Sequence, residues 1–260
     1  MGFALFITFL SGAATSLGAA LIFAAKKIPI STLAFCMSFS AGVMIYVSFG
    51  ELLPVSVKEG LPSLGGQNAK LLVMGLFALG AVMAALIDYF IPEHLNSEDK
   101  ALYEADKKHA AEMEKTGVFM GLAVMLHNLP EGLAVFSTLN ADTTLGLSIA
   151  LAIALHNIPE GLIVALPIYA ASGKKFKAFM WATFAGLSEP LGALLGFWLL
   201  AGIAHEWVFA VSNSLVAGIM VYISFDELLP MAKEYGQEHY GILGVFSGIL
   251  FIAVITALLG

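Results

Sequence analysis

The sequence predicts an all-α membrane protein with eight transmembrane helices arranged as an inverted repeat. Three observations predict this fold. The mean hydropathy is +0.89, and only 12% of the residues are charged, against about 25% in a typical soluble domain. Eight apolar stretches are each long enough to cross a bilayer. A sixteen-residue motif in the first part of the chain also recurs near its end.

The predicted spans are separated by breaks that are short and polar or contain proline. They are 2–24, 32–54, 70–91, 117–139, 145–169, 178–201, 207–229 and 241–259. The first span has no basic segment before it, so we interpret it as a membrane helix and not as a cleaved signal peptide. One longer break, 92–116, is charged throughout and is predicted to be solvated. Residues 1–260 are therefore predicted to form a single polytopic membrane domain.

The lysines predict the orientation of the chain. Ten of the twelve lysines lie in the loops after the first, third, fifth and seventh spans, whereas Lys58 and Lys70 lie on the other side. The positive-inside rule then places the loop 92–116 in the cytoplasm and both termini outside the cell membrane. The chain has no arginine, which disfavours nucleic acid as a partner. Cys36 is the single cysteine, so an intrachain disulfide is excluded.

The chain repeats itself in opposite orientation. FSAGVMIYVSFGELLP at 39–54 matches LVAGIMVYISFDELLP at 215–230 with ten identities, and 11–21 matches 185–195 more weakly. Spans 1–3 therefore correspond to spans 6–8, and span 4 corresponds to span 5. Each pair joins an odd-numbered span with an even-numbered one, so the partners run in opposite directions. Such repeats are frequent in transporters and place the substrate site near the middle of the membrane.

The phrase HNLPEG at 127–132 recurs as HNIPEG at 156–161, in the two central spans. Residues four apart share one face of a helix, so each span would present an imidazole, a carboxylate and an amide together. Such nitrogen and oxygen ligands suit Zn²⁺ and neighbouring transition metals better than Mg²⁺ or Ca²⁺. The candidate ligands are His127, Asn128, Glu131, His156, Asn157 and Glu160.

Further candidate ligands lie outside the two phrases. Glu189 lies within span 178–201 and precedes a proline. A carboxylate within a span costs roughly 2.5–3.5 kcal/mol to insert, so we expect Glu189 to join the cluster. Its repeat partner is Thr15, so the symmetry is broken there. Met44 and Met220 are repeat-related, and each could be a thioether ligand or a core side chain, which is the usual role of methionine.

Other polar residues leave their roles open. Glu51, Asp226 and Glu227 precede the two LLP phrases near the ends of their spans. They could line metal paths or be interfacial residues whose charged ends reach water. His94 and His109, in the 92–116 loop, are too few to indicate metal buffering.

These residues and spans resemble the ZIP (Zrt-, Irt-like protein) family of divalent-metal transporters. The length and the paired phrase are similar to its compact bacterial ZupT-like members, and the resemblance covers essentially the whole chain. It implies a homodimer and a binuclear metal site. One metal would be held by His127, Glu131, His156 and Glu160, with Met44 as an extra ligand. The second would be held by Asn128, Asn157 and Glu189, with Glu131 and Glu160 bridging the two.

The predicted function is therefore import of Zn²⁺, and of Fe²⁺ or similar ions, without covalent chemistry. Mn²⁺, Co²⁺ and Cd²⁺ remain alternatives because sites of His, Glu and Asn bind all of them. An intramembrane metallohydrolase is disfavoured because the chain lacks H-E-x-x-H. A transporter of organic anions is disfavoured because the spans lack arginine and mid-span lysine.

Overall fold

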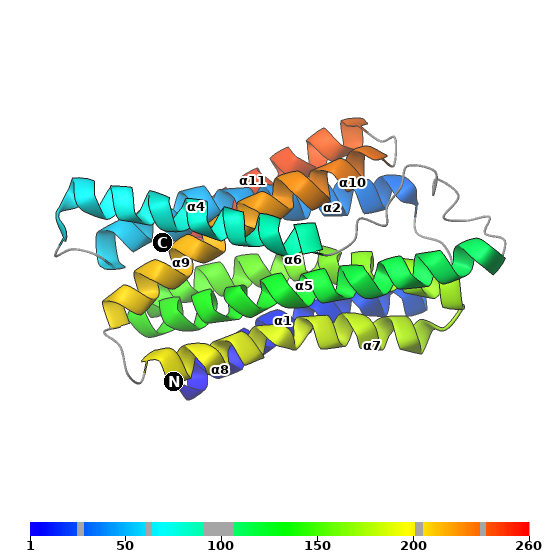
Figure 1. The fold of residues 1–260 in the computed structure, drawn as a ribbon, viewed down its shortest axis with the longest axis horizontal. Helices are drawn as coiled ribbons and strands as arrows, with labels where there is room; N and C mark the ends of the chain where they lie inside the picture. Colours follow the sequence, from blue (N-terminus) through cyan, green and yellow to red (C-terminus); the bar gives the residue numbers. More distant parts are fainter. Residues whose placement is uncertain (25–28, 61–63, 91–106, 201–204, 235–237, 260) are drawn as a thin grey trace.

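A computed structural model describes residues 1–24, 29–60, 64–90, 107–200, 205–234 and 238–259. Within these ranges the secondary structure is helical, and no strand is present (Figure 1). The predicted all-α fold is therefore confirmed. Lys26, Lys27, Lys100 and His94 lie outside the described residues, as does the side chain of His109.

The helices coincide with the predicted spans. The longer ones are α1 (Gly2–Ala24), α2 (Ile30–Tyr46), α4 (Gly66–Phe90), α5 (Lys107–Ala141), α6 (Thr143–Ser172), α7 (Lys175–Gly186), α8 (Ser188–Leu200), α9 (His205–Ile223) and α11 (Glu238–Leu259). The shorter ones are α3 (Leu53–Val55), α10 (Leu229–Glu234) and the π-helical segments η1 (Val47–Leu52), η2 (Ser56–Gly60) and η4 (Ser224–Leu228). Seven segments of the described chain are long and apolar enough to cross a membrane. The remaining predicted span, 117–139, lies wholly within α5.

The loop predicted at 92–116 is shorter than expected, because α5 already begins at Lys107. This helix has 35 residues, which is about 52 Å at 1.5 Å per residue. The hydrocarbon core is only about 30 Å thick. The charged first turns of α5 therefore extend the fourth span beyond the membrane.

Two π-helical segments interrupt the second and seventh spans at repeat-related positions. In η1 the N–H of Leu53 donates to the carbonyl of Ser48, and at η4 the N–H of Leu229 donates to that of Ser224. Each segment precedes the proline of an ELLP phrase. Proline cannot donate the next helical hydrogen bond and its ring crowds the preceding turn, so a locally wider helix accommodates it. Spacing in the sequence did not predict these segments.

The predicted span 178–201 is broken at Leu187, where α7 ends and α8 begins. Pro190 lies in the first turn of α8, where its missing N–H breaks no helical hydrogen bond. The break places Glu189 in that same first turn. A carboxylate is favourable there because unpaired N–H groups give the start of a helix a partial positive charge.

Helix pairs that correspond in the two halves pack through equivalent contacts between a glycine and a backbone carbonyl. A Cβ at Gly18 of α1 would collide with the carbonyl of Ile158 in α6, and a Cβ at Gly192 of α8 would collide with that of Leu129 in α5. These positions correspond to each other in the two halves. The reverse contacts are Gly161 on Thr15 and Gly132 on Glu189. The weak match of 11–21 with 185–195 is thus a structural equivalence.

The outer helices repeat the same arrangement. Gly42 of α2 lies against the carbonyl of Val245 in α11, and Gly218 of α9 lies against that of Phe77 in α4. The reverse contacts are Gly248 on Phe39 and Gly80 on Leu215. These contacts show which residues of α4 and α11 correspond in the two halves. They confirm the predicted correspondence of spans 2 and 3 with spans 7 and 8.

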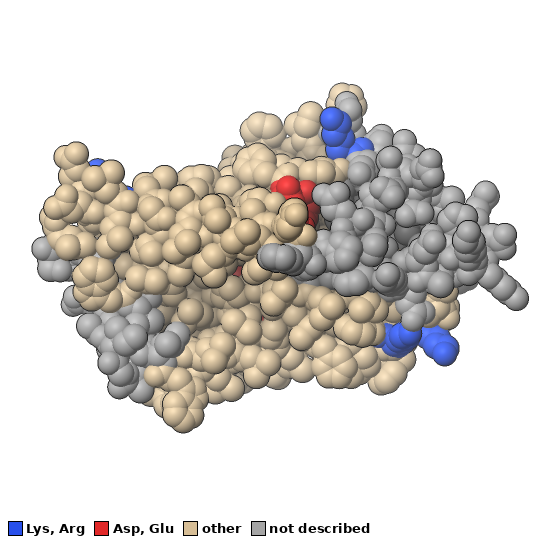
Figure 2. All heavy atoms as spheres, in the orientation of Figure 1, with Lys and Arg blue, Asp and Glu red and all other residues tan. Residues whose placement is uncertain are grey.

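The helices form two groups, which Figure 1 shows one above the other. Helices α1, α5, α6, α7 and α8 form the lower group, and α2, α4, α10 and α11 the upper one, with α9 running beside both (Figure 1). Large apolar side chains such as Leu17, Leu71 and Leu250 are exposed on the outside. Figure 2 shows a face that is mostly uncharged, with its lysines near the edges. Such a surface suits contact with lipid acyl chains.

Candidate metal site

A tight turn places the two HN-x-PEG phrases on neighbouring antiparallel helices. The carboxylate of Asp142 accepts hydrogen bonds from the backbone N–H groups of Thr144 (2.8 Å) and Leu145 (3.0 Å), which caps α6 immediately after α5 ends. Gly146 lies against the backbone of Leu139, so the two helices approach closely near the turn. The capped turn and this close approach set the register of α5 against α6.

The imidazole and carboxylate groups of the two phrases pair across the helices. Nε2 of His127 lies 3.2 Å from Oε1 of Glu160, and Nε2 of His156 lies 3.5 Å from Oε2 of Glu131. Within α6, His156 lies 3.8 Å from Glu160. All four side chains are at most 4% exposed. The crossed pairs are repeat-related, so the inverted symmetry extends into the site.

The two asparagines are anchored at equivalent places. Nδ2 of Asn157 donates to the carbonyl of Ser11 (3.1 Å), and Nδ2 of Asn128 donates to that of Ala185 (3.3 Å). Ser11 and Ala185 are the first residues of the weaker repeat match. In both residues the Nδ2 is engaged by backbone while Oδ1 has no hydrogen-bond partner. Each amide oxygen is thus held in place and remains available to a ligand.

Glu189 joins the cluster from α8. Its Oε2 accepts a 2.7 Å hydrogen bond from Nδ2 of Asn157, and the side chain is fully buried. Thr15, its repeat partner in α1, is equally buried, and its hydroxyl has no hydrogen-bond partner. The carbonyl that Thr15 could reach one turn earlier, that of Ser11, accepts from Asn157 instead. The site therefore has a carboxyl group on the Asn157 side and a hydroxyl group in its place on the Asn128 side.

Many buried polar atoms of these residues make no hydrogen bond within the protein. Twelve such side-chain atoms occur among the described residues, and nine of them belong to the predicted ligands. They include both oxygens of Glu131, both ring nitrogens of His156 and Nδ1 of His127. Burying polar atoms without partners is costly, so native proteins supply partners for most of them. These atoms are the nitrogen and oxygen ligands that a divalent transition metal would take.

The cluster is not arranged as a finished metal cage. In the described part of the chain, no group of three or more His, Cys, Asp and Glu side chains is positioned to hold an ion. The reason lies in the crossed pairs, because Glu160 faces an imidazole at 3.2 Å and Glu131 faces another at 3.5 Å. A cation would have to take these carboxylates from their imidazole partners.

Met44 is fully buried in the apolar core, as is its repeat partner Met220. The described interactions give Met44 a backbone role, since its carbonyl accepts a 2.8 Å hydrogen bond from Ser48. Ser224 donates to Met220 in the same way at 2.7 Å. No interaction among the described residues joins the Met44 sulfur to the His–Glu cluster.

Glu227 lies closer to the site than its sequence position indicated. It is partly buried in η4 and interacts electrostatically with His127 and with Asp226 and Asp88. Tyr222 donates a 3.5 Å hydrogen bond to Asp88. Asp226 is exposed, whereas Glu51, the repeat partner of Glu227, is partly buried in η1. Sequence reasoning missed the backbone anchors at Ser11 and Ala185, although the weaker repeat match paired these two residues.

The chain is similar to known proteins along nearly its whole length. Residues 91–256 match the family model described as ZIP Zinc transporter. A protein named zinc transporter ZupT from Corynebacterium aurimucosum is 42% identical over 259 residues, covering 99% of this chain and 97% of the relative. Proteins of the same name from Streptococcus mutans (41%, 96% and 95% covered) and Chlorobaculum parvum (44%, 97% and 96% covered) are similar over comparable lengths.

Proposed function

Since this chain belongs to the ZIP zinc transporter family, whose members are membrane transporters and not enzymes, we propose that it carries Zn²⁺ through the cell membrane into the cytoplasm. Zinc as cargo is supported by the names of the relatives. Import is what the family resemblance implies. The chain would act as a single polytopic membrane domain, with both termini external, as the lysine distribution indicates.

The ion would bind between α5, α6 and α8. The observation that carries this proposal is a set of nine buried polar atoms that make no hydrogen bond, all on His127, Asn128, Glu131, His156, Asn157, Glu160 and Glu189. Imidazole nitrogen and carboxylate oxygen are the ligands that Zn²⁺ prefers in proteins. Their oxygens and nitrogens would replace the water that the ion loses on leaving solution.

We propose two ions in this site. The crossed His–Glu pairs form one group of ligands, and the amide oxygens with Glu189 form a second group. Glu131 and Glu160 would contribute an oxygen to each ion. Met44 would complete the first ion only after its side chain turns from the core. Binding would exchange each carboxylate–imidazole contact for two contacts with the metal, so the cluster is filled without any covalent step.

Uptake of ⁶⁵Zn²⁺ into proteoliposomes tests the proposal. We expect the wild-type protein to take up zinc, and His127→Ala and Glu160→Ala to abolish the uptake. His239→Ala is the matched control, because this histidine is exposed on α11 and outside the cluster. Absent uptake, or uptake unchanged in the two site variants, would refute metal transport through this site.

The same assay addresses the range of cargo. We propose that Fe²⁺ is also carried, with Mn²⁺, Co²⁺ and Cd²⁺ as competitors, because His, Glu and Asn side chains bind all these ions. An excess of each unlabelled ion should reduce ⁶⁵Zn²⁺ uptake in order of its affinity. A homodimer, which the family resemblance implies, would have broad apolar surfaces available, since Leu71, Leu79 and Leu250 are exposed on α4 and α11. Cross-linking in membranes would test it.

A further inference from the structure

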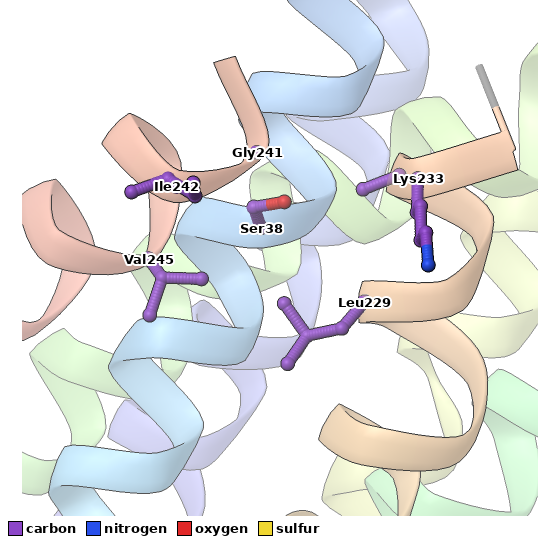
Figure 3. Close-up of a pocket in the computed structure, with 7 residues that line it drawn as sticks. Ser38, Leu229, Lys233, Gly241, Ile242 and Val245 are labelled. Atoms are coloured by element: carbon purple, nitrogen blue, oxygen red, sulfur yellow. The ribbon is translucent and has the colours of Figure 1, made fainter. Parts of the chain in front are cut away.

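A pocket of about 360 Å³ lies between α2, α10 and α11, away from the metal cluster. Its walls are mostly apolar and include Leu229, Ile242 and Val245 (Figure 3). Two polar side chains, Ser38 and Lys233, also line it. The pocket therefore combines a greasy wall with one cation and one hydroxyl.

The polar groups of this pocket have no partner among the described residues. Ser38 is 0% exposed, and its hydroxyl makes no hydrogen bond. Figure 3 shows this hydroxyl directed into the space between α2 and α10, with Lys233 on the α10 side of the same space. Buried hydroxyls nearly always find a partner. Ser38 is thus a donor aimed at whatever occupies the pocket.

The repeat-related position in the other half is closed. Ser214, the counterpart of Ser38, donates to the carbonyl of Ala210 at 2.6 Å. The equivalent glycine contacts show which residues of α4 and α11 correspond. Val73 is the counterpart of Gly241, and Phe77 is the counterpart of Val245. Val73 is 1% exposed, so the other half has a buried valine side chain where this half has Gly241. The counterpart of Lys233 is Val57.

The depth of the pocket matches the boundary between lipid headgroups and acyl chains. Gly241 is the first residue of the predicted eighth span, and Lys233 lies four residues beyond the predicted seventh. Ser38 is six residues inside the predicted second span, about 9 Å along the helix. The cation would therefore stand at headgroup level and the apolar wall below it, at the end of the molecule that the lysines mark as cytoplasmic.

We propose that this pocket binds one anionic phospholipid of the cytoplasmic leaflet. Lys233 holds its phosphate, Ser38 donates to an oxygen of its glycerol ester region, and one acyl chain lies against Leu229 and Val245. Basic pockets between transmembrane helices on the cytoplasmic side are known to bind anionic headgroups. A soluble phosphate would gain nothing from the apolar wall.

Native mass spectrometry of the detergent-purified protein tests the assignment. We expect phosphatidylglycerol to bind more tightly than phosphatidylcholine of the same acyl chains. Lys233→Gln should weaken phosphatidylglycerol about fivefold, which corresponds to the ~1 kcal/mol that a lysine contributes near an anionic lipid surface. Gly241→Val, which copies the closed repeat, should abolish the bound lipid. Its Cβ would lie 3.4 Å from Oγ of Ser38, an ordinary contact, and thermal unfolding of this variant checks that the fold is retained.

Lys174→Gln is the matched control, because Lys174 is exposed between α6 and α7 and lies on the same predicted side of the membrane. It should leave lipid binding unchanged. Equal affinity for the two lipids, an unchanged Lys233→Gln variant, or an equal loss in Lys174→Gln would overturn the proposal. Displacement of the lipid by millimolar glycerol phosphate would assign the pocket to a soluble phosphate instead. These readouts do not depend on zinc transport.

Discussion

The side-chain amide of Asn157 donates a 2.7 Å hydrogen bond to the carboxylate of Glu189 and so ties α6 to α8. The same amide reaches the carbonyl of Ser11 in α1 at 3.1 Å. One side chain therefore connects three helices of the lower group. Asn128, its repeat partner, makes only the 3.3 Å bond to the carbonyl of Ala185. The two asparagines occupy equivalent places, but Asn157 makes two hydrogen bonds to other helices and Asn128 makes one.

This inequality predicts unequal losses of stability. Asn157→Ala should lower the free energy of unfolding by about 1–3 kcal/mol, because it removes the donor of two buried hydrogen bonds. Asn128→Ala should cost about 0.5–1.5 kcal/mol, because it removes one weaker bond to a neutral carbonyl. Denaturation of the two variants in the same detergent measures the difference. Equal losses would show that the bond to Glu189 adds no stability.

The crossed pairs predict that the two histidines contribute similarly to metal affinity. His127→Ala and His156→Ala should each weaken zinc binding at least tenfold, because replacing even the partner of a metal ligand typically costs 10–100-fold. Titration of the purified protein with zinc against a fluorescent chelator measures the affinities. Glu160→Gln, which keeps the shape of the side chain and removes its charge, should also weaken binding. If either variant bound zinc with the affinity of the wild-type protein, the histidine that it lacks would lie outside the site.

The backbone contacts at glycine predict which small substitutions are not tolerated. Gly161→Ala should destabilise the protein by about 1–3 kcal/mol, because its Cβ would collide with the carbonyl of Thr15 and the helices would have to separate. Gly75→Ala in α4 is the control, since a Cβ there meets nothing within 4 Å. Thermal unfolding of both variants should show a lower midpoint for Gly161→Ala alone. Similar midpoints would mean that α1 and α6 can move apart freely.

The lysine distribution predicts the sidedness of the exposed loops. In a Cys36→Ser background, Asn68→Cys should react with a membrane-impermeant maleimide added outside intact cells. Lys174→Cys should react only after the membrane is permeabilised. Both positions are exposed in the structure, so access depends on the membrane and not on burial. The opposite pattern of labelling would place both termini in the cytoplasm.

The membrane spans and the grouping of the buried His and Glu side chains could be predicted because they depend on local composition and spacing. Apolar length alone predicted the helices, and the four-residue spacing of His127 and Glu131 predicted their common face. The second copy of the phrase predicted that these side chains meet His156 and Glu160, whereas the crossed pairing itself was seen only in the structure. These features need only the geometry of one helix and the correspondence of two repeats.

Other features depend on contacts between distant residues and could not be predicted. Asn157 bonds to Ser11, which is 146 positions away, and no local pattern indicates that contact. The break at Leu187 and the π-helical segments depend on how a proline is accommodated, and Pro130 and Pro159 lie inside continuous helices. Proline thus lies near a helix break or a π-helical segment at some positions and inside a continuous α-helix at others. The role of Met44 could not be predicted either. The sequence allowed it to be a metal ligand or a core side chain, and the structure buries it in the apolar core.

The glycine-to-carbonyl contacts also determine how much conformational entropy the helices lose when they meet. Glycine and alanine have no side-chain rotamers to lose, whereas a buried methionine or glutamine loses about 1.5–2 kcal/mol. Pairs that meet through Gly18 and Gly161, or through Gly42 and Gly248, therefore assemble with little entropic opposition. In lipid there is no hydrophobic drive to bring helices together. A low entropic cost is what allows van der Waals contact between bare backbones to hold these pairs.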